Sequence, residues 1–289
     1  MIPKAFEYLA PKTLPEAISL LQQHGNTARI LAGGHSLIPL MKLRQTTPDY
    51  VIDINKISGL DYIKESDGYL RIGALTREAA LEESELIRSK YPIILDTARV
   101  LGDQQVRNMA TVVGNIAQSD PGYDLPATML ALNAQVAVTG AQGERIIPID
   151  ELFIDYLKTA LQPDEIITEI SIPIPPAGSG GAYVKLESRL GGTVGVAASV
   201  TLDEDKVCQT AGIGLTNVAL TPLKAKKAEE LLSGKILDEG IILQAAQLAA
   251  EESKPTSDIR APEEYKRAIV KELARRALTF ALGRTQAGK

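Results

Sequence analysis

A cluster of prolines and glycines at residues 173–181 constrains the fold of this chain more than any other sequence feature. It contains Pro173, Pro175 and Pro176, followed by Ala-Gly-Ser-Gly-Gly. Proline removes a backbone donor and glycine is conformationally permissive, so such a cluster marks a connection between folded units. The 289 residues are also enough for two domains. We therefore expect a boundary near residue 177, with domains over residues 1–176 and 177–289.

The first of these domains alternates helical and strand patterns. Thr13-Leu14-Pro15-Glu16 is a capping box, and the helix that it begins is expected to end at Gly25. Apolar periodicity predicts further helices and strands, which suggests an α+β domain with subdomains over about residues 1–55 and 56–176. The expected strands cover residues 28–32, 50–54 and 69–73, the helices 76–86 and 92–101, and a hairpin 135–139 and 144–147.

The second domain is expected to be a small antiparallel sheet followed by helices. Strand patterns cover residues 182–187, 194–202 and 206–215, and helical patterns begin at Pro222. In the last helix the apolar residues recur at three- and four-residue steps, at Ile269, Val270, Leu273, Ala277 and Phe280.

Composition limits the chemistry available to the chain. A net charge of −5 gives no general attraction for nucleic acid or for an anionic membrane. A single cysteine, Cys208, excludes an intrachain disulfide and a four-thiolate cluster, and we expect this thiol to be buried and inert. His24 and His35 are the only histidines, so we expect no metal on this chain, and redox chemistry would need an organic cofactor. Without an apolar signal-peptide core or spanning run, we expect a cytoplasmic location.

Two segments concentrate residues suited to binding a polar ligand. The first is a strand that runs into Gly33-Gly34 beside His35 and Ser36, where backbone N–H groups can converge on phosphate oxygens. An ordinary strand-to-loop turn is the alternative for a bare glycine pair, and the segment is neither a P-loop nor a G-x-G-x-x-G motif. The glycine pair alone therefore does not identify a ligand.

The second segment extends from Gln105 to Pro126. Its small hydrogen-bonding residues suggest a loop wrapped around a polar ligand, although pure turn chemistry is the alternative for Asp120-Pro121-Gly122. The residues that favour a ligand are Thr111, Asn115, Ser119 and Asp124.

Taken in order, these segments resemble the medium, FAD-binding subunits of molybdenum hydroxylases of the carbon monoxide dehydrogenase and xanthine dehydrogenase type. The family loops A-G-G-H/Q-S-L, I-R-N-x-A-T-x-G-G-N and D-P-x-x-D-L-P correspond to Ala32–Leu37, Val106–Asn115 and Asp120–Pro126. The resemblance covers essentially the whole chain. Further matches lie at residues 53–55, 72–76 and 163–167, and at Leu161, Lys185 and Arg189.

The resemblance implies non-covalent FAD in a two-subdomain fold of the vanillyl-alcohol-oxidase or p-cresol-methylhydroxylase type, with the pyrophosphate held between the first two loops. Asp124 would accept hydrogen bonds from ribityl or ribose hydroxyls, and Lys185 would lie beside the adenine or the flavin ring, unless it is a solvated surface lysine. The residues expected at the cofactor are Ile30, Leu31, Ala32, Gly33, Gly34, His35, Ser36, Leu37, Ala74, Thr111, Val113, Gly114, Asn115, Ala117, Asp124, Leu161 and Lys185.

The resemblance also implies partners: a large subunit with molybdopterin and a small subunit with [2Fe–2S] clusters, from which FAD passes electrons to a terminal acceptor. No catalytic side chain is expected on this chain. Two alternatives stay open, a free-standing FAD-dependent oxidase or dehydrogenase and a nucleotide-binding assembly subunit without redox function.

Three features bear on these alternatives. Val113 replaces the first glycine of the family's G-G-N, which is expected to shift the loop and favours the assembly subunit. The stretch 190–193, Leu-Gly-Gly-Thr, replaces an acidic or aromatic residue expected near the flavin. His35 is a candidate for covalent attachment, although the resemblance favours a role in packing the loop or in donating to a phosphate.

Overall fold

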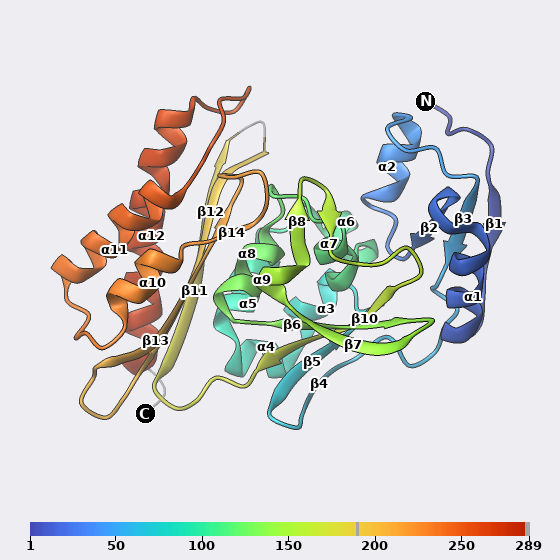
Figure 1. Ribbon diagram of the computed structural model, residues 1–289. Helices are drawn as coiled ribbons and strands as arrows, with labels where there is room; N and C mark the ends of the chain where they lie inside the picture. Colours follow the sequence, from blue (N-terminus) through green and yellow to red (C-terminus); the bar gives the residue numbers. More distant parts are fainter. Residues whose placement is uncertain (189–190, 287–289) are drawn as a thin grey trace.

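The computed structural model describes residues 1–188 and 191–286. Two subdomains and a C-terminal unit lie side by side, with the first subdomain on the right of Figure 1 and the C-terminal sheet and helices on the left. The expected α+β organisation is confirmed by this arrangement. No helix in the described ranges is both long and apolar enough to span a membrane.

The first subdomain is a parallel sheet with strand order β1-β3-β2. Its elements are β1 (Glu7–Leu9), α1 (Leu14–His24), the 3₁₀ turn Gly25–Thr27, β2 (Ala28–Leu31), α2 (Leu37–Lys42) and β3 (Tyr50–Asp53). Helix α1 begins and ends where the sequence predicts. Thr13 accepts a hydrogen bond from the Glu16 N–H at 3.3 Å, and Gly25 leaves the helix with a φ of +53°.

The second subdomain contains a five-stranded sheet of order β4-β5-β10-β6-β7. Strands β6 and β7 form the predicted hairpin, with Gly140 opposite Gly143. A two-stranded ribbon of β8 and β9 follows helix α9. The elements are β4 (Ile63–Ser66), β5 (Tyr69–Gly73), β6 (Gln135–Gly140), β7 (Gly143–Pro148), α9 (Ile149–Leu152), β8 (Phe153–Asp155), β9 (Lys158–Thr159) and β10 (Ile166–Pro173).

Short helices connect β5 to β6, and two expectations for this region are wrong. The helix expected over residues 76–86 is two helices, because Ser84 leaves the helical conformation and caps the second by accepting from the Ile87 N–H. The segment from Gln105 to Ala117, expected as a loop, forms two helices capped by Asp103 and Thr111. The helices are α3 (Glu78–Glu83), α4 (Glu85–Lys90), α5 (Pro92–Arg99), α6 (Gln104–Met109), α7 (Val112–Ala117) and α8 (Asp124–Ala131).

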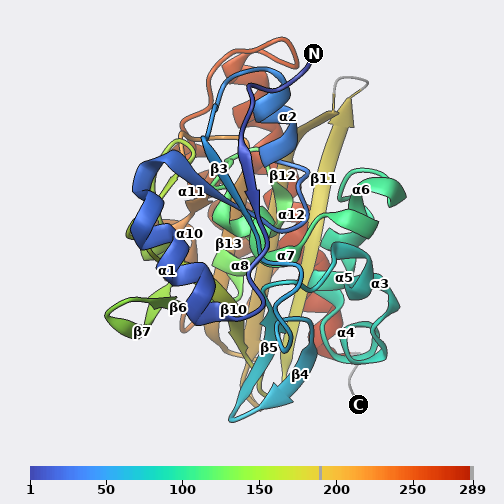
Figure 2. The ribbon, with the colours of Figure 1, turned by 90° about the vertical axis from the view of Figure 1, so that its right-hand side faces the viewer.

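Several of these connecting helices lie on one side of the molecule. Seen from the side of the first subdomain, α3, α4 and α6 gather on the right, and α1 and β7 lie on the left (Figure 2). Residues of both subdomains contribute to one apolar core, which includes Ile52 of β3 and Ile72 of β5. The two subdomains therefore share a packed interface.

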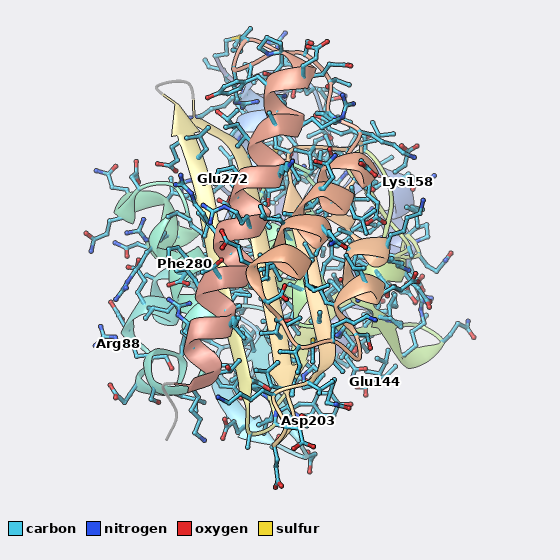
Figure 3. The ribbon with its side chains drawn as sticks, turned by 90° about the vertical axis from the view of Figure 1, so that its left-hand side faces the viewer. Arg88, Glu144, Lys158, Asp203, Glu272 and Phe280 are labelled. Carbon is cyan, nitrogen blue, oxygen red and sulfur yellow. The ribbon has the colours of Figure 1, made fainter. Side chains whose placement is uncertain are left out.

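The C-terminal unit is an antiparallel sheet of order β11-β12-β13-β14, and the helices that follow it cover one face (Figure 3). An antiparallel sheet followed by helices was predicted, but the short strand β14 lies where the helical part was expected to begin at Pro222, and the first helix starts only at Lys226. Val270, Leu273 and Ala277 of the last helix are buried, but Phe280 is 54% exposed on its outer face and Ala281 is buried instead. Cys208 is buried in β13 as expected. The elements are β11 (Ser179–Ser188), β12 (Gly191–Leu202), β13 (Cys208–Thr216), β14 (Leu223–Lys224), α10 (Lys226–Leu232), α11 (Glu239–Glu252) and α12 (Glu263–Gln286).

The other face of this sheet packs directly on helices of the second subdomain. Helix α8 contacts β12 and β13, and α5 contacts β11. A Cβ on Gly212 would lie 2.8 Å from the Ala131 carbonyl carbon, and one on Gly214 would lie 2.9 Å from Ala127 Cα. Glycine at both positions allows the backbone of α8 to contact the sheet directly.

Candidate functional site

A cleft of about 590 Å³ lies where the first subdomain meets helices α3, α6, α7 and α8 and strand β11. Its size is within the range of small-molecule and cofactor sites. All of the predicted cofactor residues line it except Leu31, Ala74 and Val113. The cleft therefore brings together the two segments that the sequence analysis selected, which are about 75 residues apart in the chain.

The three exceptions lie beside the cleft or in the core. Ala74 is 2% exposed and Val113 is 4% exposed, and both belong to the main apolar core. Leu31 lies in β2 and its Cδ1 approaches Gly34. Val113 is part of helix α7, whose backbone conformation valine adopts without strain. The replacement of glycine by Val113 therefore does not require the loop to shift.

The glycine pair lets the first loop close on the junction between α6 and α7. A Cβ on Gly33 would overlap the Met109 carbonyl oxygen and would lie 2.7 Å from Ala110 Cα and 2.9 Å from the Thr111 nitrogen. Gly34 has a φ of +79°, which glycine adopts without steric cost. Each glycine thus has its own physical reason to be at its position.

A short bridge to the start of α3 fixes the second loop. Arg77 pairs with Thr111 in an isolated antiparallel bridge, in which the Val112 N–H donates to the Thr76 carbonyl at 3.0 Å. The Thr111 side chain accepts a hydrogen bond from the Gly114 N–H at 3.1 Å. The cleft wall over residues 111–115 is consequently held by main-chain and capping bonds that do not depend on a ligand.

Asp124, Tyr183 and Lys185 form a buried cluster at the inner end of the site. Lys185 Nζ donates to Asp124 Oδ2 at 2.8 Å and to the Val100 carbonyl at 3.2 Å, and the Tyr183 hydroxyl donates to Asp124 Oδ1. The Lys185 side chain is only 10% exposed, so it is not a solvated surface lysine. Burial, followed by the charge of Asp124, raises the pKa of Tyr183 well above its usual value, so this phenol is a donor to the carboxylate.

Several residues that line the cleft were not predicted. Glu78 has no sequence signal, whereas Tyr123 lies within the family-like stretch 120–126 and its hydroxyl lies 3.0 Å from Ser36 Oγ. The unpredicted lining residues are Arg29, Glu78, Leu101, Gly102, Val106, Ala110, Gln118, Gly122 and Tyr123.

Glu78 is a buried carboxyl group in the cleft wall. It is 2% exposed, and its Oε1 accepts a hydrogen bond from Asn115 Nδ2 at 2.9 Å. Burial raises the pKa of Glu78 to about 7, against the opposing effect of the Asn115 hydrogen bond. The group therefore changes protonation near neutral pH.

Other predicted features lie around the cleft. His35 lines it and is exposed. Of the stretch 190–193, Leu190 lies outside the described residues, as does Arg189, while Gly192 packs against the Lys185 side chain and Thr193 is 2% exposed. Within the described ranges, no group of three or more histidine, cysteine, aspartate or glutamate residues could hold a metal ion.

A second cavity, of about 540 Å³, lies between β11 and the segment 173–176. Several of its charged and hydroxyl side chains have partners within the protein. Arg284 donates to Asp96, Lys90 to Glu65, and Ser199 to the Ala131 carbonyl. The larger cleft is therefore the better candidate site, because it contains the selected loops and a buried cation.

Comparison with known proteins relates both parts of the chain to described families. Residues 4–175 match the family described as the FAD binding domain in molybdopterin dehydrogenase, and residues 191–281 match the CO dehydrogenase flavoprotein C-terminal domain. The carbon monoxide dehydrogenase medium chain of Afipia carboxidovorans is 42% identical over 287 residues, which cover 99% of this chain and 100% of the relative.

Solved structures show the same arrangement. The carbon monoxide dehydrogenase from Hydrogenophaga pseudoflava that lacks the Mo-pyranopterin moiety contains a similar chain with a TM-score of 0.95 and 40% identity, covering 98% of this chain and 99% of that one. Quinoline 2-oxidoreductase from Pseudomonas putida 86 contains another, with a TM-score of 0.90 and 29% identity, covering 99% of both chains.

Proposed function

The chain belongs to the family of FAD-binding medium subunits of molybdenum hydroxylases, and on this premise we propose that the cleft described above is its FAD site. It is an electron-transferring subunit of an oxidoreductase. The predicted α+β fold, an FAD-binding domain followed by a small antiparallel sheet with helices, is confirmed by the similarity to solved structures.

The observation that carries the proposed site is the close approach of two separate loops. Gly33 contacts the backbone of residues 109–111 so tightly that no Cβ fits, and residues 32–36 and 111–115 line the same cleft. Exposed backbone N–H groups in such loops can bind phosphate oxygens. A buried oxygen, Asn115 Oδ1, has no hydrogen-bond partner among the described residues. These features fit the pyrophosphate and hydroxyl groups of FAD.

The predicted residues would have distinct tasks at the cofactor. The backbone of residues 32–36 and 111–115 would hold the pyrophosphate, and Leu161 and Lys185 would lie beside the adenine or flavin ring. When bound, FAD supplies a carrier that connects one-electron clusters with a two-electron acceptor. Asp124, Glu187 and the Val100 carbonyl hold the Lys185 ammonium in place, and its charge would favour the reduced, more negative ring.

Leu31, Ala74 and Val113 would support the cofactor through packing rather than by contact, since they do not line the cleft. His35 would pack the first loop or donate to a phosphate, and we propose that attachment of FAD is non-covalent. No side chain of this subunit would act on the organic substrate. The partners that we propose are a large molybdopterin subunit and a small [2Fe–2S] subunit, from which the electrons arrive.

The visible absorption spectrum of the purified chain, before and after acid precipitation, tests the proposal. Oxidised-flavin bands that move to the supernatant would support non-covalent FAD. Bands that remain with the pellet would indicate covalent attachment, for which His35 is the candidate, and turnover of a substrate by the chain alone would favour a free-standing oxidase. A colourless protein that FAD does not reconstitute would overturn the redox function and favour the assembly subunit.

Two further features belong to the proposal. We place the domain boundary near residue 177, with domains 1–176 and 177–289 and subdomains 1–55 and 56–176; β10 ends at Pro173 and β11 begins at Ser179. Limited proteolysis tests this division. We also assign the chain to the cytoplasm, which cell fractionation would check.

A further inference from the structure

Two oxygen atoms in the cleft wall have no donor within the described part of the chain. Glu78 uses Oε1 to accept from Asn115 Nδ2, but no described residue donates to its Oε2. Asn115 Oδ1 is buried and likewise has no partner among the described residues. Both residues line the cleft. A buried acceptor without a partner carries a desolvation cost that a bound donor would remove.

Asp124 is in a different state, although the sequence analysis selected it as the hydroxyl acceptor. Each of its oxygens is already engaged, Oδ1 by the Tyr183 hydroxyl and Oδ2 by the Lys185 ammonium. It is 4% exposed and forms an ion pair at 2.8 Å. Its carboxylate therefore positions the lysine, whereas Glu78 Oε2 and Asn115 Oδ1 are acceptors in this wall that receive no hydrogen bond from a described residue.

The main chain holds Glu78 in place. It is the first residue of α3, and its N–H donates to the Ala110 carbonyl at 2.9 Å. Asn115 is anchored one helix away, since its N–H donates to the Thr111 carbonyl at 3.0 Å. The backbone of both residues is therefore held by the same bonds as the second loop, and their side chains are joined to each other by the hydrogen bond at 2.9 Å.

We propose that Glu78 and Asn115 form an acceptor pair that binds sugar hydroxyl groups of the cofactor. This rests on the proposed FAD site and specifies which residues recognise the polyol. The phosphates of FAD offer only acceptors, so they cannot donate to Asn115 Oδ1 or to Glu78 Oε2 of the ionised carboxylate. Hydroxyl groups can, and both the ribityl chain and the adenosine ribose carry neighbouring hydroxyls.

The test is a cycle that combines protein variants with cofactor analogues. The flavin-free chain is titrated with FAD and with analogues that lack one ribityl hydroxyl or one ribose hydroxyl, and binding is followed by flavin fluorescence. At pH 8, where Glu78 is mostly ionised, Glu78→Ala should weaken FAD binding by about 10- to 100-fold, as expected for loss of a hydrogen bond to a charged group. The analogue without the recognised hydroxyl should bind wild type weakly but lose little further affinity in the variant.

The two sets of analogues identify the source of the hydroxyl. Coupling with the ribityl analogues alone would place the pair at the flavin half, and coupling with the ribose analogues alone would place it at the adenosine half. If the loss of affinity caused by Glu78→Ala and the loss caused by the missing hydroxyl simply add for every analogue, the proposal is overturned. If wild type binds FAD but Glu78→Ala binds it equally well, the pair is not a ligand, while failure of wild type to bind FAD at all would instead refute the proposed function.

Two further variants separate recognition from folding. Glu83→Ala removes an exposed glutamate from the same helix and should leave FAD affinity unchanged. Glu78→Gln keeps the shape and an oxygen for Asn115, so it serves if Glu78→Ala does not fold. It should give a smaller loss of FAD affinity than Glu78→Ala, and this loss should likewise shrink with the analogue that lacks the recognised hydroxyl. If the loss caused by Glu78→Gln is the same for FAD and for every analogue, that result also counts against the acceptor pair.

Discussion

Gly33→Ala should separate the two loops that form the cleft. Gly33 has an ordinary negative-φ or extended backbone, so the reason for glycine is space alone. The new Cβ would overlap the Met109 carbonyl oxygen and lie 2.7 Å from Ala110 Cα. The three nearest atoms all belong to the backbone, so no side chain can rotate away to relieve the overlap.

The size of the effect follows from this overlap. Ordinary Cβ contacts begin near 3.4 Å, so Ala110 Cα must retreat by about 0.7 Å. Overpacking of this kind costs about 1–3 kcal/mol. If the free loops relax apart and FAD must draw them together again, the same energy weakens FAD binding by about 5- to 150-fold.

The measurement is a fluorescence titration of the flavin-free variant with FAD, together with thermal unfolding of the loaded form. Gly283→Ala is the matched control, because Gly283 lies in α12 and a Cβ added there would meet no atom within 4 Å beyond the adjacent backbone of its own helix. That control should stabilise the chain by up to about 1 kcal/mol and leave FAD affinity unchanged. A Gly33→Ala variant that binds FAD as tightly as wild type would refute the close-approach reasoning.

Three other substitutions have defined outcomes. Lys185→Met should lower the reduction potential of bound FAD by roughly 30 mV, equivalent to about 1.4 kcal/mol for two electrons; an unchanged potential in a potentiometric titration would remove the lysine from the flavin. Tyr183→Phe removes a donor from buried Asp124 and should reduce the free energy of unfolding in urea by about 1–3 kcal/mol, and equal stability would contradict that hydrogen bond. Burial raises the pKa of Glu229 from 4.5 to about 7, so its contribution to stability is complete below 4.5 and is lost as pH rises through 7. In wild type the free energy of unfolding should therefore fall by about 3 kcal/mol at most between pH 4 and pH 8, and Glu229→Gln, which can still accept from the Ile213 N–H, should remove this fall. Identical dependence of unfolding free energy on pH in wild type and variant would argue against the raised pKa of Glu229.

The sequence was sufficient for elements whose signals are local. The capping box at Thr13, the glycine pair and the hairpin over residues 135–148 were all predicted, because each depends on a few adjacent residues. The segment 105–117 was misassigned as a loop, since its hydroxyl and amide residues are typical of turns. The caps Asp103 and Thr111 were the available signal for two short helices.

The charged part of the site could not be predicted in the same way. Glu78 follows a threonine and an arginine at the start of a helix, where a glutamate is ordinarily an exposed partner of the helix dipole. Glu78 is buried instead beside Ala110 and Asn115, which are more than 30 residues away in sequence. Tyr183 is buried in β11, but its hydrogen-bond partner Asp124 is 59 residues away in sequence, a pairing that no local pattern encodes.

The direct contact between α8 and the glycines of β13 has a consequence for how this protein can be recombined. Asp124 begins α8, whereas Tyr183 and Lys185 belong to the sheet that α8 contacts. The polar cluster of the cleft is therefore formed by residues from both sides of the proposed domain boundary near residue 177. A chimaera that joins one relative's first domain to another's second would need a matching glycine face as well as the three polar residues. The whole chain, rather than either half, must therefore be exchanged to transfer this site, although the two halves match separate families.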